Sequence, residues 1–261
     1  MRTLQSAFFW VAIVFLMIIW LPLLFVIKTF DRNSTRYITG KWFRKLGKAI
    51  TALNPAWKVR VEGQTDFDDR KPYVMVCNHL SNADIPVISN LSCEMKWVSK
   101  KELFTVPVTG WMMSWAKDIS VDRKADNRGA AVYKQSSFFL DNDVSIIYFP
   151  EGTRSKSGKL NKFARGAFDI AIRKKVDILP MVIDGTQNCL PKNTWKFGKA
   201  DSIRLKVLPP ISTSGLKKDD VPALIDTVRG VILKELASMR GIPEQEVDGM
   251  VVSKSKDQVQ S

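Results

Sequence analysis

The chain has 261 residues and a formal net charge of +14, enough for one well-buried domain with an added membrane element. The charge predicts an anionic partner, namely nucleic acid, anionic lipid or a phosphorylated substrate, although a merely soluble basic surface stays open. The three cysteines lie far apart and form no paired motif, which argues against a disulfide framework. Because there is one histidine and no cysteine cluster, a zinc site of the usual ligand types is not expected.

The N-terminal segment is the most apolar part of the chain. Residues 7–27 are uncharged and nearly all apolar, a length that can span a bilayer, and they lack the small-residue cleavage site of a signal peptide. Pro22 predicts a bend, so a crossing helix and a helix half-buried in one leaflet both remain open. Seven basic residues follow within residues 28–48, and the positive-inside rule then places the rest of the chain on the cytoplasmic side.

A second, amphipathic helix is expected to follow and to end near Asn54 and Pro55. Apolar residues recur at helical spacing over residues 38–53, while a basic face lies on the other side. This pattern is typical of a helix in the membrane interface, with a core-facing helix as the alternative. The basic face consists of Lys41, Arg44, Lys45 and Lys48. Residues 1–54 are therefore predicted to form a membrane-anchoring helix pair.

Residues 55–243 alternate between short β-branched runs and helical stretches. Strands are expected at 57–61, 73–77, 95–99, 119–121, 144–149, 178–183 and 203–208, and helices at 84–91, 108–116, 127–140, 163–173 and 220–238. This alternation predicts an α/β domain with a mostly parallel central sheet flanked by helices. Residues 244–261 are polar without periodicity and are expected to form a disordered tail.

Two loops are favoured as the functional site, because ligands of open α/β sheets bind beyond the carboxyl ends of strands. His79 follows the apolar run 73–77, and Glu151-Gly152-Thr153-Arg154 follows the apolar run 144–149. If the two strands are close in the sheet, the loops meet at one edge.

The first loop carries an acid–base pair. Histidine is the side chain whose unperturbed pKa best suits proton transfer near neutral pH, and His79 is the only one. Asp84 lies five positions later and can hydrogen-bond one ring nitrogen, which fixes the tautomer and leaves the other nitrogen as a base. A second role for Asp84, two residues before Pro86 and compatible with the first, is an ordinary helix N-cap.

The second loop suits an anion. The fork of Arg154 matches a phosphate or carboxylate, and Gly152 lets a backbone N–H approach a ligand. Lys100 and Arg123 follow two further strands. Taken singly, each of these residues also fits an ordinary turn or a solvated charge.

Together, five motifs in this order resemble the lysophospholipid and glycerolphosphate acyltransferase family, and most of all its bacterial 1-acylglycerol-3-phosphate acyltransferases. They are NHxxxxD at 78–84, KKELF…P…G at 100–110, a strand ending in VDR at 119–123, FPEGTRS at 149–155 and LPxxIxG at 179–185. The resemblance covers roughly residues 55 to 210. One departure is Ser120, which replaces an apolar residue usual before the VDR triplet.

The resemblance implies acyl transfer from acyl-CoA or acyl carrier protein to a glycerol hydroxyl, as in phosphatidic acid synthesis. It assigns the general base to His79 and its orientation to Asp84. It implies that backbone N–H groups or Lys100 stabilise the oxyanion. Binding of the glycerol-phosphate acceptor is assigned to Arg123, Glu151, Gly152, Thr153 and Arg154.

The same resemblance implies no metal and no cofactor, with the acyl thioester as a substrate. The implied partners are an anionic phospholipid membrane, a lysophospholipid acceptor and the thioester donor, and no nucleic acid. The implied location is the cytoplasmic face of a membrane, the inner membrane in a bacterium. Another lysolipid acceptor, thioester hydrolysis, and a non-catalytic protein of the membrane surface remain as alternatives.

Overall fold

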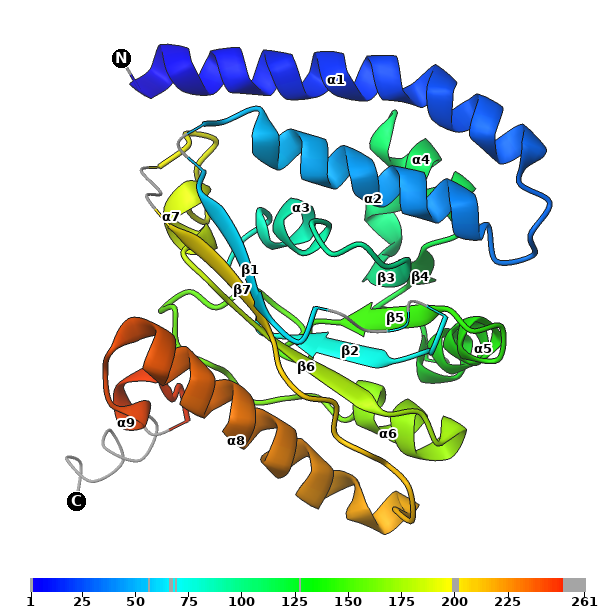
Figure 1. Ribbon diagram of the computed structural model, residues 1–261, viewed down its shortest axis with the longest axis vertical. Helices are drawn as coiled ribbons and strands as arrows, with labels where there is room; N and C mark the ends of the chain where they lie inside the picture. Colours follow the sequence, from blue (N-terminus) through cyan, green and yellow to red (C-terminus); the bar gives the residue numbers. More distant parts are fainter. Residues whose placement is uncertain are drawn as a thin grey trace.

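The computed structural model describes residues 2–55, 57–65, 68, 70–126, 128–198 and 202–250. Its centre is a seven-stranded sheet in the order β1-β7-β6-β2-β5-β3-β4 (Figure 1). All neighbours pair in parallel except β6 and β7, which are antiparallel. The strands are β1 (Val59–Gly63), β2 (Val74–Cys77), β3 (Met95–Lys100), β4 (Ile119–Val121), β5 (Ser145–Tyr148), β6 (Ile178–Asp184) and β7 (Ile203–Val207). The expected mostly parallel sheet is thereby confirmed, with all seven strands at the predicted places.

The central strands are apolar on both sides because both faces of the sheet are covered. Every residue of β2 is buried, with Val74 and Val76 in one core cluster and Met75 and Cys77 in the other. The strand β7 lies nearer the edge and instead alternates buried Ile203, Leu205 and Val207 with the half-buried Arg204 and Lys206. The sheet is thus the middle layer of a molecule with helices on both faces.

The helices divide between the two faces (Figure 1). One side carries α1 (Arg2–Phe30), α2 (Tyr37–Ala52), α3 (Asp84–Ile88), α4 (Thr109–Trp115) and α7 (Thr186–Cys189). The other carries α5 (Arg128–Leu140), α6 (Gly166–Lys174), α8 (Val221–Arg240) and α9 (Glu244–Val247). Short 3₁₀ helices span Lys101–Thr105 and Lys218–Asp220. The five helices expected in the body, 84–91 to 220–238, are all present.

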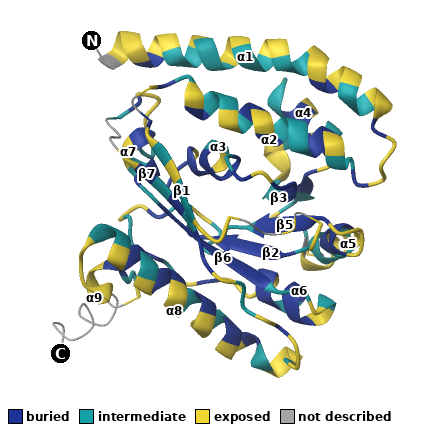
Figure 2. Ribbon diagram, in the orientation of Figure 1, coloured by how far each residue is buried: buried dark blue, intermediate teal, exposed yellow. Residues whose placement is uncertain are grey.

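The helix α1 lies lengthwise against α2 and α4 as the outermost layer on its side (Figure 1). Leu24 is fully buried against Leu46 and Met112, whereas the outer face of α1 exposes large apolar side chains along its whole length (Figure 2). Within the described residues, α1 is the one helix long and apolar enough to cross a membrane. A row of exposed apolar side chains of this length is unusual for a surface that faces water.

A buried cluster of four charges fastens α2 to the sheet. Arg44 pairs with Asp118 at 2.5 Å, Lys96 pairs with Glu94 at 2.6 Å, and Arg44 Nε lies 3.6 Å from Glu94. A side chain at Gly40 would collide with the Glu94 carboxylate, so this glycine allows the close approach of α2. The prediction that Arg44 belongs to the outer basic face of the helix is therefore wrong. The Arg44 side chain points inward and neutralises two buried carboxylates.

The C-terminal end of the fold lies later than expected. Glu244–Val247 form α9, and Val247 is completely buried in the cluster that also holds Leu160 and Ile232. The prediction of a disordered tail is wrong for residues 244–250, because this polar stretch contains one core-facing side chain. Residues 251–261 of the predicted tail lie outside the described residues.

Replacing Arg44 by alanine is expected to lower the free energy of unfolding by about 3–5 kcal/mol, because it leaves the buried carboxylate of Asp118 without its cationic partner. Denaturant unfolding followed by tryptophan fluorescence measures the change. The control is Arg165→Ala, which breaks the exposed Arg165–Asp169 pair and should cost less than about 1 kcal/mol. Equal losses in the two variants would contradict the structural role of the buried cluster.

Candidate active site

The two predicted loops lie side by side because β2 and β5 are neighbours in the sheet. The backbone N–H of Ser155 donates to the carbonyl of His79 at 2.8 Å, which joins the loops directly. On the other side of β2, the amide side chain of Asn78 both donates to the carbonyl and accepts from the N–H of Ile183, each at 2.8 Å. The expectation that the loops meet at one edge is therefore confirmed, and Asn78 ties that edge to β6.

His79 and Asp84 form a hydrogen-bonded pair. His79 Nδ1 donates to Asp84 Oδ2 at 2.7 Å, and the same oxygen accepts the backbone N–H groups of Leu80 at 2.8 Å and Ser81 at 3.0 Å. The Asp84 side chain is completely buried, whereas that of His79 is 15% exposed. Three N–H donors thus converge on one oxygen of a buried carboxylate and fix its position. This geometry leaves Nε2 as the basic nitrogen of the imidazole.

The N-cap role considered for Asp84 is wrong. Ala83 occupies the N-cap position of α3, and no side chain caps the helix there. The Asp84 carboxylate instead turns back toward the preceding loop and the histidine. The imidazole is further held by Phe149, whose ring stacks on it with centroids 3.9 Å apart and an interplanar angle of 11°.

Glu151 bridges the two loops with both carboxylate oxygens. Oε1 accepts the backbone N–H of His79 at 2.7 Å, and Oε2 accepts the backbone and side-chain N–H groups of Asn161 at 3.0 and 2.6 Å. Burial raises the pKa of the Glu151 carboxyl, and these hydrogen bonds counter the shift only in part. With both oxygens engaged by the protein, Glu151 acts as a positioning residue for His79.

The C-terminal segment supports Asn161 in turn. Arg229 donates to the carbonyls of Asn161 at 3.1 Å and Leu160 at 2.9 Å, and it pairs with Asp248 at 2.6 Å. The backbone N–H of Leu160 donates to the carbonyl of Val247 at 2.8 Å. Val247 and Asp248, which follow α8, therefore stabilise the loop at Asn161 that in turn positions Glu151. No spacing in the sequence indicates this chain of contacts.

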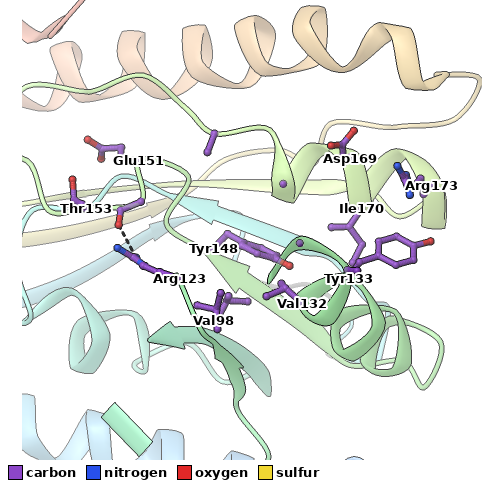
Figure 3. A pocket seen from close by; sticks show the side chains of 16 residues that line it. Val98, Arg123, Val132, Tyr133, Tyr148, Glu151, Thr153, Asp169, Ile170 and Arg173 are labelled. Atoms are coloured by element: carbon purple, nitrogen blue, oxygen red, sulfur yellow. Dashed lines mark hydrogen bonds between the residues drawn. The ribbon is translucent and has the colours of Figure 1, made fainter. Parts of the chain in front are cut away.

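Three of the remaining predicted residues line one large cavity, and two do not. The exposed Arg123 donates to the carbonyl of Gly152 at 2.7 Å (Figure 3). Both residues and Thr153 line a cavity of about 930 Å³ between α5 and α6, which we call the α5–α6 groove. Arg154 and Lys100 do not line it, and Lys100 is exposed at the carboxyl end of β3.

A second cavity, of about 530 Å³, lies on the opposite side of the sheet. Side chains from all four helices α1 to α4 line this α1–α4 cavity, including Met17, Phe43, Ile85 and Met112. Asn82 lines the cavity, so one end of the cavity lies beside the His79–Asp84 loop. The cavity wall also includes Arg44 of the buried charge cluster. A mostly apolar chamber of this size suits a hydrocarbon group.

The cysteines near the pair do not supply a nucleophile. Cys77 and Cys189 are both buried. Burial, with an added contribution from the Asp84 charge, raises the pKa of the Cys189 thiol to about 12 and raises that of Cys77 as well. Because the thiolate is the reactive form, both thiols are inert near neutral pH. Among the described residues, no group of three or more His, Cys, Asp or Glu side chains could hold a metal ion.

Comparisons with known proteins agree on one family. The family model described as Acyltransferase matches residues 58–184. The 1-acyl-sn-glycerol-3-phosphate acyltransferase alpha of Mus musculus is 36% identical over 178 residues, 67% of this chain and 62% of that protein. The 1-acyl-sn-glycerol-3-phosphate acyltransferase of Saccharomyces cerevisiae is 30% identical over 211 residues, 78% of this chain and 67% of that protein. The chain thus spans about 62% of the length of its mammalian relatives.

A solved structure has the same fold. The crystal structure of the 1-acyl-sn-glycerophosphate acyltransferase PlsC from Thermotoga maritima superposes with a TM-score of 0.76 at 24% identity. The match covers 92% of this chain and 98% of that one. The likeness therefore extends from the sheet to the N-terminal helices and supports the arrangement described above.

Replacing Asn161 by alanine is expected to lower the free energy of unfolding by about 1–3 kcal/mol at neutral pH, because Glu151 loses a donor. The folded-state pKa of Glu151 already lies above its unfolded value. Losing the Asn161 donor raises the folded-state pKa of Glu151 further in the variant. The charge-dependent part of the cost is therefore fully present above the variant's folded-state pKa, and it disappears below the folded-state pKa of the native chain, where the carboxyl is protonated in both folded proteins. Denaturant unfolding across the acidic to neutral range measures this dependence.

The matched control is Asn142→Ala, because Asn142 is exposed and its side chain donates only to the carbonyl of Phe138 one turn earlier. Its effect should be small and independent of pH. A loss in the Asn161 variant that does not vary with pH would show that the Asn161 side chain acts by packing and not through the Glu151 charge.

Proposed function

This chain belongs to the acyltransferase family, and on that premise we propose that it transfers a fatty acyl group from acyl-CoA or acyl carrier protein to the free hydroxyl of lysophosphatidic acid. The product is phosphatidic acid. The observation that carries the proposal is the 2.7 Å hydrogen bond between His79 and the buried Asp84, in a loop whose Asn82 lines one cavity and whose backbone bonds to Glu151 of the other. The printed names of the relatives support this choice of acceptor.

The proposed reaction is a direct transfer with His79 as the general base. Nε2 removes the proton of the acceptor hydroxyl as its oxygen bonds to the thioester carbonyl carbon. When the tetrahedral intermediate collapses, the carbon–sulfur bond breaks and the imidazolium returns the proton to the thiolate. Asp84 orients the ring and stabilises the imidazolium, as its three donors and burial suit it to do. No cofactor enters these steps.

The substrates are assigned by the chemistry of the walls. The α1–α4 cavity takes the acyl chain, because it is mostly apolar and begins beside Asn82. The acceptor phosphate is assigned to Arg123 with Gly152 and Thr153 at the inner end of the α5–α6 groove. Arg154 adds charge nearby, and backbone N–H groups or Lys100 stabilise the oxyanion.

The membrane is the proposed site of action. The apolar outer face of α1 enters the lipid, while Lys41, Lys45 and Lys48 of α2 attract anionic headgroups. Since α1 lies against the domain and does not project from it, immersion of this face in one leaflet is favoured over a free crossing helix (Figure 1). The positive-inside rule assigns the cytoplasmic side.

Replacing His79 by alanine is expected to reduce kcat by about 10²–10⁴-fold, the scale of general base catalysis. Lipid mass spectrometry of phosphatidic acid formed from lysophosphatidic acid and acyl-CoA measures the rate. The control Asn142→Ala should retain full activity. Retention of activity by the histidine variant would overturn the assignment of the base, and free fatty acid as the main wild-type product would indicate a hydrolase.

Adding charge to α1 is expected to weaken membrane binding. The double change Phe15→Asp and Ile19→Asp puts two carboxylates on its exposed face and should reduce co-flotation with anionic vesicles at least about tenfold. Val231→Asp on α8, across the sheet, is the control and should float like the native chain (Figure 1). If the α1 variant floats as well as the control, the lipid-facing role of α1 is wrong.

A further inference from the structure

The α5–α6 groove extends well beyond the loops that the proposed chemistry uses. Its inner end is formed by Arg123, Gly152 and Thr153, close to the loop that carries His79 (Figure 3). Its outer end is formed by Tyr133 and Arg173, from α5 and α6. A volume of about 930 Å³ exceeds what a glycerol-phosphate group needs, so most of the groove has no assigned occupant.

The outer end presents the exposed positive charge of Arg173, which also interacts electrostatically with Asp169. The Arg173 guanidinium lies 5.2 Å from the centre of the Tyr133 ring, and it makes no ion pair within the described part of the chain. Asp169 also lines the groove, but it is neutralised by two hydrogen bonds from Arg165 at 2.8 and 3.0 Å. These bonds lower the pKa of Asp169, so it stays a paired carboxylate.

Between its ends, the groove is mostly apolar. Val98, Val132 and Ile170 form its walls, and the Tyr148 hydroxyl is already bonded to Ser136 at 2.8 Å. Burial raises the pKa of that hydroxyl to about 12, so this wall stays neutral. The groove therefore suits an elongated ligand with a largely uncharged body and a phosphate at its far end.

The position of the two cavities indicates which substrate this is. The α1–α4 cavity and the α5–α6 groove lie on opposite sides of the sheet, and two hydrogen-bonded loops reach them: Asn82 of the His79 loop lines the cavity, and Glu151 lines the groove. A thioester donor carries its hydrocarbon on one side of the reacting carbonyl and its carrier on the other. If the hydrocarbon occupies the α1–α4 cavity, the carrier leaves the site through the groove.

We propose that the α5–α6 groove binds the phosphopantetheine arm of the acyl donor, with the arm's phosphate against Arg173. This inference rests on the proposed function and assigns the donor's path within it. The acceptor phosphate then occupies the inner end at Arg123, so the two phosphates lie at opposite ends of the groove. Coenzyme A and acyl carrier protein share this arm, and they differ in what is attached beyond the phosphate.

The first test removes the outer charge. Arg173→Gln should raise KM about tenfold for acyl-CoA and for acyl carrier protein, and leave KM for an acyl N-acetylcysteamine thioester, which lacks the phosphate, within twofold. The matched control is Lys175→Gln, which removes one exposed charge two residues later, outside the groove. If KM increases for acyl-CoA alone, Arg173 contacts the nucleotide of coenzyme A and not the shared arm, which contradicts the proposal. An increase with both carriers assigns it to the shared arm.

The second test fills the groove. Gly166 lines it, and a Cβ built there meets no atom within 4 Å, so Gly166→Leu is expected to place its side chain in the groove. The inhibition constant of coenzyme A against acyl-CoA should rise at least about tenfold. Gly230→Leu on α8 is the control, because a Cβ there also meets nothing within 4 Å and lies outside the groove.

Two further outcomes overturn the inference. If Arg173→Gln raises KM for lysophosphatidic acid and not for the donors, the groove belongs to the acceptor. If Arg173→Gln and Gly166→Leu behave like their controls, the donor arm lies elsewhere. Failure of the proposed function is a separate result, because the wild-type chain would then form no phosphatidic acid with any donor. In that case the binding of coenzyme A to the wild-type chain and to the two variants would still test the groove.

Discussion

The arrangement of the site depends on the buried carboxylate of Glu151. Its two oxygens accept one N–H from the loop after β2 and two from Asn161, so one side chain fixes the spacing of the segments that carry His79 and Asn161. A buried carboxylate without partners is costly, and three N–H donors offset much of that cost. A neutral glutamine could accept through only one of the two oxygen positions. The charge is therefore part of the positioning.

This constraint explains why parts remote in the sequence belong to one site. Asn161 is held by Arg229, and Arg229 is held by Asp248, so α8 and the segment after α9 stabilise the loop behind His79. His79, the proposed base, lies at the same edge of the sheet, where its ring stacks on Phe149 and is hydrogen-bonded to Asp84. The parallel order of β2 and β5 brings both sets of contacts to the carboxyl ends of the strands, where each cavity also begins.

The local features of the sequence were sufficient to predict the strands and the histidine–aspartate pair. Apolar runs such as residues 73–77 report burial on both faces, and the spacing of His79 and Asp84 lies within one loop. The roles of Asn161 and Arg229 were not predictable, because they depend on contacts between residues 68 positions apart. The sequence suggested Glu151 as a ligand for substrate, whereas its partners lie within the protein. Arg44 was misplaced because a helical pattern records which residues share a face and not which face meets the sheet.

That misplaced arginine bears on how the α1–α4 cavity keeps its shape. An apolar chamber roofed by two helices gains by collapsing, since every empty volume forfeits contacts between its walls. Arg44 resists this, because moving α2 inward or away would separate it from Asp118 and Glu94 in a place where water cannot replace them. The cluster is neutral as a whole, with Lys96 balancing the second carboxylate. The desolvation of these charges offsets much of their attraction, so the cluster mainly fixes the position of α2. The helices above the cavity therefore stay at a constant distance from β3, and the outer face of α1 remains free to contact lipid.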